Sequence, residues 1–148
     1  MKIYIRSVSK DIEERIMIEC HEVREDIKEI VDFVKSKDTT LTAYMDQDVF
    51  YISLHDIYYI DSVDNKVFVY LKDKVYELKN KLYEFESLYA GKSFFRCSKS
   101  VIVNLIKIEC IKPALNSRFV AKMKNGEEVI ISRKYIPDLK QKLQGGIV

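Results

Sequence analysis

The chain has 148 residues, of which 47% are hydrophobic and 32% are charged, so we expect one domain, or a domain with a small appendage, that can bury a core. Three cysteines without a Cys-x-x-Cys pair argue against a disulfide framework and against a zinc site, and we expect reduced thiols in a cytoplasmic protein. No window approaches the ~20 apolar residues that span a bilayer, so we expect no membrane insertion.

The charge is distributed unevenly along the chain. Residues 91–148 hold 12 lysines and arginines against 4 acidic residues, a net charge of +8, whereas residues 41–90 carry −4 and residues 1–40 carry −2. Clustered cations release counterions from phosphates, so this distribution indicates a polyanionic partner. A solubilising face would give the same pattern, and charge alone does not separate the two interpretations.

The first 40 residues predict a small β-β-α unit. Residues 3–8 (IYIRSV) and 16–20 (IMIEC) alternate or run apolar over the length of a strand. Residues 23–37 then place apolar side chains at helical spacing, with acidic residues early and lysines late, as the helix dipole favours. The polar KDTTL stretch breaks this pattern, so we expect an N-terminal β-β-α appendage at 1–40 and a second domain at 41–148.

The rest of the chain alternates short strands with polar turns. β-branched and aromatic residues dominate five successive segments, LTAYM, VFYISL, IYYIDS, KVFVYL and KVYEL. A helix is expected over residues 78–89, ended by Gly91, and three more strand segments and a short helix over 135–143 follow. Asn125-Gly126 predicts a tight hairpin in which both residues take positive φ. The fold class is therefore mainly β (α+β).

Residues suited to catalysis are scarce. The two histidines are His21 and His55, and the motifs of serine hydrolases, zinc proteases and P-loop proteins are missing from the sequence. His55 lies in a turn-like LHD segment, where a surface histidine is more common than a metal ligand. We therefore predict that the chain is not an enzyme and has no catalytic residues, no metal and no cofactor.

One stretch combines polar and apolar residues in an unusual way. Residues 94–111 (FFRCSKSVIVNLIKIECI) place Arg96, Ser98, Lys99 and Ser100 in an otherwise nearly continuous apolar run. If the flanking apolar residues pack inward, the polar ones occupy a rigid corner. Arginine can donate two hydrogen bonds to guanine or phosphate, lysine adds a point charge and serine adds a hydroxyl. We therefore interpret this corner as a surface that contacts DNA.

Other polar turns are built in a similar way. They are the hairpin tip at 64–66, the connection at 116–118 and the pair Arg133-Lys134. A polar turn is ordinary by itself. Two cationic corners, at 96–99 and 133–134, nevertheless both lie in the most basic third of the chain, which favours a shared role.

The succession of motifs in residues 41–148 resembles a LytTR-type DNA-binding domain. IYYIDS-x₃-KVFVYL, YELKNKLYEFE, FFRCSKSVIVNLIKIECI and KNGEEVIISRKYIPDLKQKL follow one another as they do in that family. The resemblance implies a LytTR-like β-strand domain with short helices, which inserts loops into successive major grooves of double-stranded DNA. It also implies a bacterial transcriptional regulator that binds paired half-sites as a homodimer.

Carried over position by position, the resemblance implies DNA contacts by Asn65 or Lys66, by Arg96 and Lys99, and by Arg133. Many members have histidine where Asn65 and Ser98 stand, so the base preference at Ser98 stays open. Together with neighbouring residues of the same polar turns, the expected DNA-binding residues are Asn65, Lys66, Arg96, Ser98, Lys99, Arg118, Arg133 and Lys134.

The first 40 residues do not resemble the phosphoacceptor receiver that often precedes this domain. They are too few and lack the acidic cluster of a receiver, so the chain resembles the small stand-alone regulators of the family. Two roles for this appendage stay open. It is either a dimer or partner surface, or a cover for one edge of the β domain.

Two other function classes also stay open. A protein–protein interaction module would dock a partner, for example a membrane protein, through exposed strands and the N-terminal helix. A binder of RNA or single strands would need aromatic residues such as Phe119 and Tyr135 on the basic face. Two further residues of the segment 94–111 have expected structural roles. Asn104 is expected to cap a short helix, and Cys97 is expected to be a buried, inert thiol rather than a redox sensor.

Overall fold

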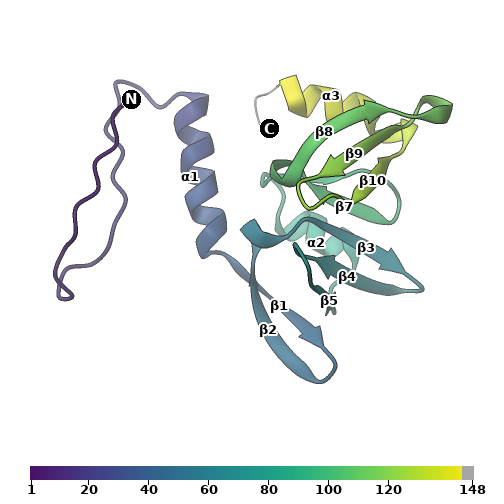
Figure 1. Ribbon diagram of the computed structural model, residues 1–148, viewed down its shortest axis with the longest axis horizontal. Helices are drawn as coiled ribbons and strands as arrows, with labels where there is room; N and C mark the ends of the chain where they lie inside the picture. Colours follow the sequence, from purple (N-terminus) through teal and green to yellow (C-terminus); the bar gives the residue numbers. More distant parts are fainter. Residues whose placement is uncertain (145–148) are drawn as a thin grey trace.

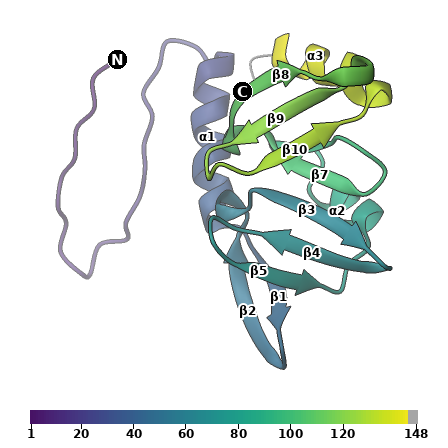
Figure 2. The ribbon, with the colours of Figure 1, turned by 45° about the vertical axis from the view of Figure 1, so that its right-hand side comes forward.

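A computed structural model describes residues 1–144, without the side chains of residues 36 and 38. An extended N-terminal segment leads into one helix and then into a body made of two antiparallel sheets and two more helices (Figures 1 and 2). The sequence GGIV at residues 145–148 predicts a frayed end, and these residues lie outside the described range.

Within residues 1–144, ten strands form the two sheets. The large sheet has the order β2-β1-β5-β4-β3-β7-β6, and the small sheet has the order β10-β9-β8. The strands are β1 (Thr40–Met45), β2 (Asp48–Ser53), β3 (Tyr59–Val63), β4 (Lys66–Tyr70), β5 (Val75–Leu78), β6 (Phe94–Arg96), β7 (Val101–Asn104), β8 (Ile108–Pro113), β9 (Phe119–Met123) and β10 (Glu128–Ile131). The helices are α1 (Glu25–Asp38), α2 (Leu82–Leu88) and α3 (Ile136–Gln144). The predicted mainly β fold with short helices is confirmed.

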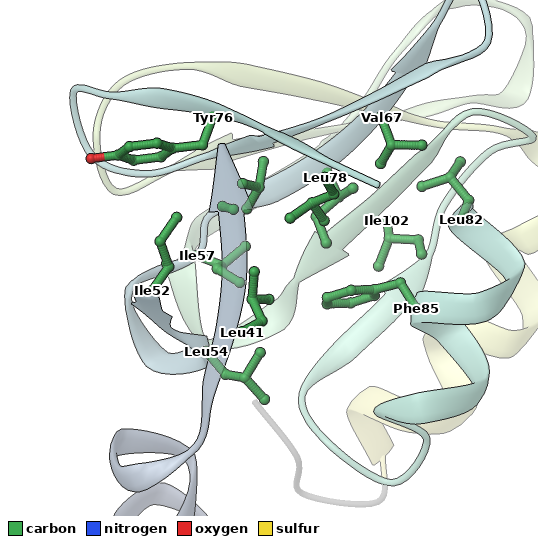
Figure 3. Packing of buried hydrophobic residues seen from close by; sticks show 13 residues of the cluster. Leu41, Ile52, Leu54, Ile57, Val67, Tyr76, Leu78, Leu82, Phe85 and Ile102 are labelled. Atoms are coloured by element: carbon green, nitrogen blue, oxygen red, sulfur yellow. The ribbon is translucent and has the colours of Figure 1, made fainter. Parts of the chain in front are cut away.

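Side chains alternate between two hydrophobic cores. The first core lies between one face of the large sheet and α2, where Val67 and Ile102 pack near Phe85 (Figure 3). The second core lies under the small sheet and α3, and it includes Val103 and Leu139. Because the two cores share the strands in the middle of the body, the two sheets are held as one unit.

Strand β7 is buried on both faces. Ile102 faces the first core with 1% exposure, and the adjacent Val103 faces the second core with no exposure. Its neighbour β6 repeats this pattern, since Phe94 packs against Phe85 with ring centroids 5.0 Å apart and Phe95 belongs to the second core. A strand between two packed layers has no polar face, which explains the nearly continuous apolar run in this part of the sequence.

Asn104 links these layers through hydrogen bonds. The residue is 1% exposed, and its Nδ2 donates to the carbonyl oxygen of Ile57 at 2.7 Å. Its Oδ1 accepts from Ser93 Oγ at 2.6 Å and from the backbone N–H of Ile106 at 3.4 Å. The last contact caps the 3₁₀ helix η2 (Leu105–Lys107), so the predicted capping role of Asn104 is confirmed.

Two tight connections differ in their backbone. Asp64 and Asn65 join β3 to β4 with φ angles of 52° and 63°, which is the two-residue turn that matches the twist of a hairpin. At Asn125-Gly126 the same geometry was predicted, but only Gly126 has a positive φ, at 91°. The reason is that this loop is longer, because Met123 N–H donates to Glu127 O at 2.8 Å and the Asn125 side chain accepts from Glu127 N–H at 3.2 Å.

The predicted β-β-α appendage is wrong in its two strands. Residues 1–24 contain no strand, and Ile3 and Ile5 are 84% and 95% exposed. Helix α1 is present as predicted, and it contacts the body through Ile27, which is 3% exposed, and through Phe33, whose ring lies edge-on to His55 at 4.7 Å. A two-stranded hairpin with nothing packed on it is marginal in water, which explains why the strand pattern of this segment produces no ladder in a single chain.

Candidate nucleic-acid interface

Two loops leave the large sheet at the same end. Strands β3 and β7 are antiparallel with Asp61 opposite Val101, and the N–H of Ser62 donates to the carbonyl oxygen of Ser100 at 2.8 Å. The β3–β4 tip at 64–65 and the β6–β7 loop at 97–100 therefore project side by side (Figures 1 and 2). Since neighbouring strands are about 4.8 Å apart, the centres of the two hairpins are separated by roughly 10 Å.

A cationic segment of the small sheet joins the two loops at this end. The N–H of Ser132 donates to the carbonyl oxygen of Cys97 at 2.8 Å, which places the 3₁₀ helix η4 (Arg133–Tyr135) beside the β6–β7 loop. Because Ile131 pairs with Phe119, the β8–β9 connection that contains Arg118 lies next to the start of η4. The polar turns of the sequence thus converge on one side of the body.

Most of the expected contact residues are open to solvent in this arrangement. The exposed ones are Asn65, Lys66, Lys99, Arg118, Arg133 and Lys134. Ser98 is half-buried, and its hydroxyl oxygen accepts from the N–H of Ser100 at 3.2 Å within the turn. Convergent cations on exposed loops form a surface that can contact several phosphates at once.

Arg96 lies differently from the other cations. Its Nε donates to the carbonyl oxygen of Ser98 at 2.7 Å, and a terminal nitrogen donates to the carbonyl oxygen of Lys99. Another terminal nitrogen lies 3.7 Å from Oε1 of Glu86 on α2, and the Arg96 side chain is 23% exposed. The guanidinium therefore stabilises the shape of its own loop. A sequence pattern does not reveal this role, because the acceptors are backbone carbonyl oxygens.

The thiol of Cys97 faces the second core next to this loop. Cys97 has no exposed surface, and burial raises the pKa of its thiol to about 12. The thiolate, which is the reactive form, is therefore scarce near neutral pH. The predicted buried, inert thiol is confirmed, despite the positive charge of Arg96 nearby.

The aromatic residues of the basic end are engaged in packing. Phe119 and Tyr135 are half-buried and pack against the second core. Lys140 lies over the ring of Phe119 at 5.9 Å and Lys134 over the ring of Tyr135 at 5.7 Å. Rings held in this way do not offer the free faces on which unpaired bases stack, which argues against a single-strand binder.

The histidines show no arrangement for metal chemistry. His55 packs against Phe33, and its partial burial and the positive charges of Lys107 and Lys37 lower its pKa, so the ring is neutral near pH 7. His21 is exposed. Within residues 1–144, no three His, Cys, Asp or Glu side chains are grouped so that they could hold a metal ion. In the same range no helix is both long enough and apolar enough to cross a membrane.

These features define a β-stranded DNA-binding domain, and comparison with known families agrees. The family described as LytTr DNA-binding domain matches residues 47–144, and the chain belongs to this family. The resemblance seen in the sequence is thereby confirmed, and the family is one of DNA-binding domains and not of enzymes. A solved LytTr DNA-binding domain of a Bacillus cereus response regulator has a TM-score of 0.68 and 30% identity, covering 71% of this chain and 96% of that one.

Two relatives show how far the similarity extends along the chain. Transcriptional regulatory protein YpdB of Escherichia coli K12 is 30% identical over 109 residues, which is 73% of this chain. The chain spans only 45% of the length of that relative. A Staphylococcus aureus protein described as an uncharacterized HTH-type transcriptional regulator is 27% identical over 145 residues, 97% of this chain and 98% of that protein. The second similarity therefore includes the N-terminal segment.

Proposed function

We propose that this chain is a bacterial transcriptional regulator that binds double-stranded DNA sequence-specifically through its loops. The β3–β4 tip, the β6–β7 loop and η4 would enter neighbouring major grooves. One observation supports this proposal above the others: the β3–β7 register and the hydrogen bond from Ser132 to Cys97 bring two cationic loops and the polar β3–β4 tip to one end of the body.

The chemistry of the exposed side chains supports base and phosphate contacts. Arg133 can donate two parallel hydrogen bonds to guanine, and the amide of Asn65 can pair with adenine in the same way. Lys66, Lys99 and Lys134 are suited to phosphates, where a point charge is sufficient. In residues 1–144, strands separate α1 from α2 and α2 from α3, so no helix-turn-helix pair competes with the loops for this role.

The rigidity of the β6–β7 loop supports sequence-specific recognition of DNA rather than non-specific electrostatic binding. The β6–β7 loop is held by two strands that pack into both cores and by the Arg96 guanidinium on its carbonyl oxygens. A loop with one shape loses little conformational freedom on binding, so more of the contact energy appears as affinity. We assign Arg96 a positioning role, in which it acts on DNA through the loop that it shapes.

The first test replaces Arg133 by alanine. We expect Arg133→Ala to weaken binding by about 1–3 kcal/mol and to reduce the steepness with which affinity falls as salt rises. The probe is a DNA duplex selected from a random library by binding to the unmodified chain, and the measurement is fluorescence anisotropy. Arg24→Ala, at the exposed N-cap of α1, is the matched control. Unchanged affinity and salt dependence in Arg133→Ala would argue against the proposal.

A second test separates positioning by Arg96 from simple charge. Arg96→Lys keeps the positive charge but cannot donate to two carbonyl oxygens from one planar group. We therefore expect Arg96→Lys to lose about as much DNA affinity as Arg96→Ala, while Lys99→Arg keeps most of it. If Arg96→Lys restores the affinity of the unmodified chain, charge is the whole contribution of Arg96.

Location and partners complete the proposal. A regulator of this kind works where chromosomal DNA lies, so we place it in the cytoplasm. A role in protein binding is compatible with DNA binding, because many exposed apolar side chains lie in the N-terminal segment, on the other side of α1 from the loops (Figures 1 and 2).

A further inference from the structure

A cavity lies at the free edge of the large sheet, where β6 is the last strand. Helix α2 covers one face of this end of the sheet and α3 covers the other, since Phe85 belongs to the first core and Leu139 to the second. Beyond the edge, a cavity of about 770 Å³ opens between the two helices and β6. Pockets of roughly 300–1,000 Å³ are typical of sites for small organic molecules.

Aromatic rings form much of the cavity wall. Tyr89, Phe94, Phe95 and Tyr135 line it. The rings of Tyr89 and Phe94 both pack on Phe85, at centroid distances of 4.7 and 5.0 Å, so their positions are fixed from behind. Burial raises the pKa of Tyr89, and its hydroxyl therefore stays protonated well above neutral pH. The wall suits a flat aromatic body, because aromatic pairs add a favourable interaction to the burial of apolar area.

Four charged side chains also line the cavity, and they are Glu86, Arg96, Asp138 and Lys142. The two cations are half-buried, whereas both carboxylates are exposed and more strongly screened by water. Within residues 1–144, no carboxylate lies within ion-pair distance of Lys142, whose ammonium donates to the carbonyl oxygen of Phe94 at 3.3 Å. A half-buried cation without an ionic partner favours an anionic ligand over a cationic one.

Arg96 has one terminal nitrogen left for such a ligand. Its Nε and the other terminal nitrogen donate to the carbonyl oxygens of Ser98 and Lys99, and we call these two contacts the Arg96 brace. The remaining nitrogen lies 3.7 Å from Oε1 of Glu86, which is longer than a hydrogen bond. A ligand carboxylate can therefore accept from this nitrogen while the brace stays intact, and Lys142 adds an attractive charge in the same cavity.

We propose that this cavity is an effector site for a small aromatic carboxylate, and that its occupation raises the affinity of the chain for DNA. The aromatic body packs against the rings of the wall, and the carboxylate binds Arg96. The ligand then holds the guanidinium in the position that the brace requires, which stabilises one shape of the β6–β7 loop. Tyr135, the last residue of η4, lines the same cavity, so the ligand also restrains the second cationic segment.

The effect on DNA follows from the preference of the ligand for one state of the loop. A ligand that binds the braced state better than other states shifts the population toward it. The coupling is reciprocal, so DNA must raise the affinity for the ligand by the same factor. This coupling rests on the proposed DNA binding, whereas the ligand site itself does not.

The first experiment measures ligand binding to the full chain without DNA. The probe is naphthylacetate, whose fluorescence anisotropy is free of tryptophan interference because the sequence contains no tryptophan. Its neutral amide, naphthylacetamide, has nearly the same shape and should bind at least about tenfold more weakly, because it lacks the charge. The cationic analogue naphthylmethylamine should bind no better than the amide.

A pair of lysine variants locates the site. Lys142→Met should lower the affinity for naphthylacetate and leave that for naphthylacetamide unchanged. Lys140→Met is the matched control, since Lys140 is exposed on the same helix and does not line the cavity, and it should bind both probes as the unmodified chain does. Circular dichroism checks that both variants are folded. Absent binding of naphthylacetate, equal binding of acid and amide, or full binding by Lys142→Met would each overturn the proposal.

The second experiment measures the affinity for the selected DNA duplex with and without saturating naphthylacetate. We expect the ligand to tighten DNA binding by about fivefold or more in the unmodified chain and in Lys140→Met. Unchanged or weaker DNA binding at saturation would overturn the effector role. A chain that binds naphthylacetate but no DNA would overturn the proposed function together with the effector role, whereas a chain that binds DNA but not the acid would overturn the effector site alone.

Discussion

Strand β7 and the N-terminal arm, residues 1–24, are built in part from similar residues but have different structures. Both place β-branched apolar residues in a short extended run, Val101–Val103 in one case and Ile3–Ile5 in the other. Strand β7 pairs with β3 and β6 and is covered on both faces, whereas the arm has no covering layer in one chain. An apolar extended pattern therefore shows that a segment can be a strand, and the neighbouring layers decide whether it becomes one.

The largest expected effect compares two isoleucines, one in each region. Ile102 is 1% exposed in β7 and Ile5 is 95% exposed in the arm. We expect Ile102→Ala to lower the free energy of unfolding by about 2–5 kcal/mol, because it removes buried contacts and leaves a cavity. Ile5→Ala should change it by less than about 0.5 kcal/mol in monomeric protein. Urea denaturation at low protein concentration measures both, and equal effects would contradict the distinction between the regions.

A smaller effect is expected where the body depends on a buried polar group. Asn104→Ala removes the amide that donates to the Ile57 carbonyl oxygen and accepts from Ser93. Since the carbonyl oxygen of the buried Ile57 loses its donor, we expect a loss of about 1–3 kcal/mol in the free energy of unfolding. Urea denaturation gives the value. A loss below the error of the method would show that water or a rearranged backbone satisfies these groups.

The smallest effect concerns two cysteines, Cys97 in the body and Cys20 in the arm. Burial raises the pKa of Cys97 from 9.0 to about 12, so its stabilising contribution is complete below pH 9 and is lost as pH rises toward 12. We expect the free energy of unfolding to fall less steeply above pH 9 in Cys97→Ala than in the unmodified chain. In native protein a thiol reagent should modify the exposed Cys20 quickly and Cys97 only on unfolding. Equal modification rates would contradict the burial of Cys97.

The body was predictable from sequence because its local signals agree with its tertiary contacts. Alternation in IYYIDS and KVFVYL corresponds to β3 and β4, and the amide of Asn104 caps η2 as its position suggested. The two strands predicted in the arm are absent because hydrophobic periodicity depends only on the side chains of the segment itself. It does not show whether another element covers them. The longer loop at Asn125-Gly126 departs from its prediction for a similar reason, because the side chain of Asn125 closes the turn.

The loops that form the candidate site were predictable from the sequence. The roles of individual residues in these loops were less predictable. The pairing of β3 with β7 brings the loops at 64–65 and 97–100 together, and the hydrogen bond from Ser132 to Cys97 adds residues 133–135. The role of Arg96 did not follow, since an arginine in a polar corner has the same sequence signature whether it faces a ligand or its own backbone. Only the position of its guanidinium on the Ser98 and Lys99 carbonyl oxygens separates the two.

The Arg96 brace has a consequence for how such a protein can change its target. The guanidinium holds the main chain of residues 98 and 99, the Ser98 hydroxyl bonds within the turn, and the exposed Lys99 side chain projects from a loop whose shape these contacts set. Natural variation or laboratory selection could therefore exchange the Lys99 side chain with the scaffold left intact. New operator preferences would then arise by substitution at that position, without redesign of the surrounding sheets.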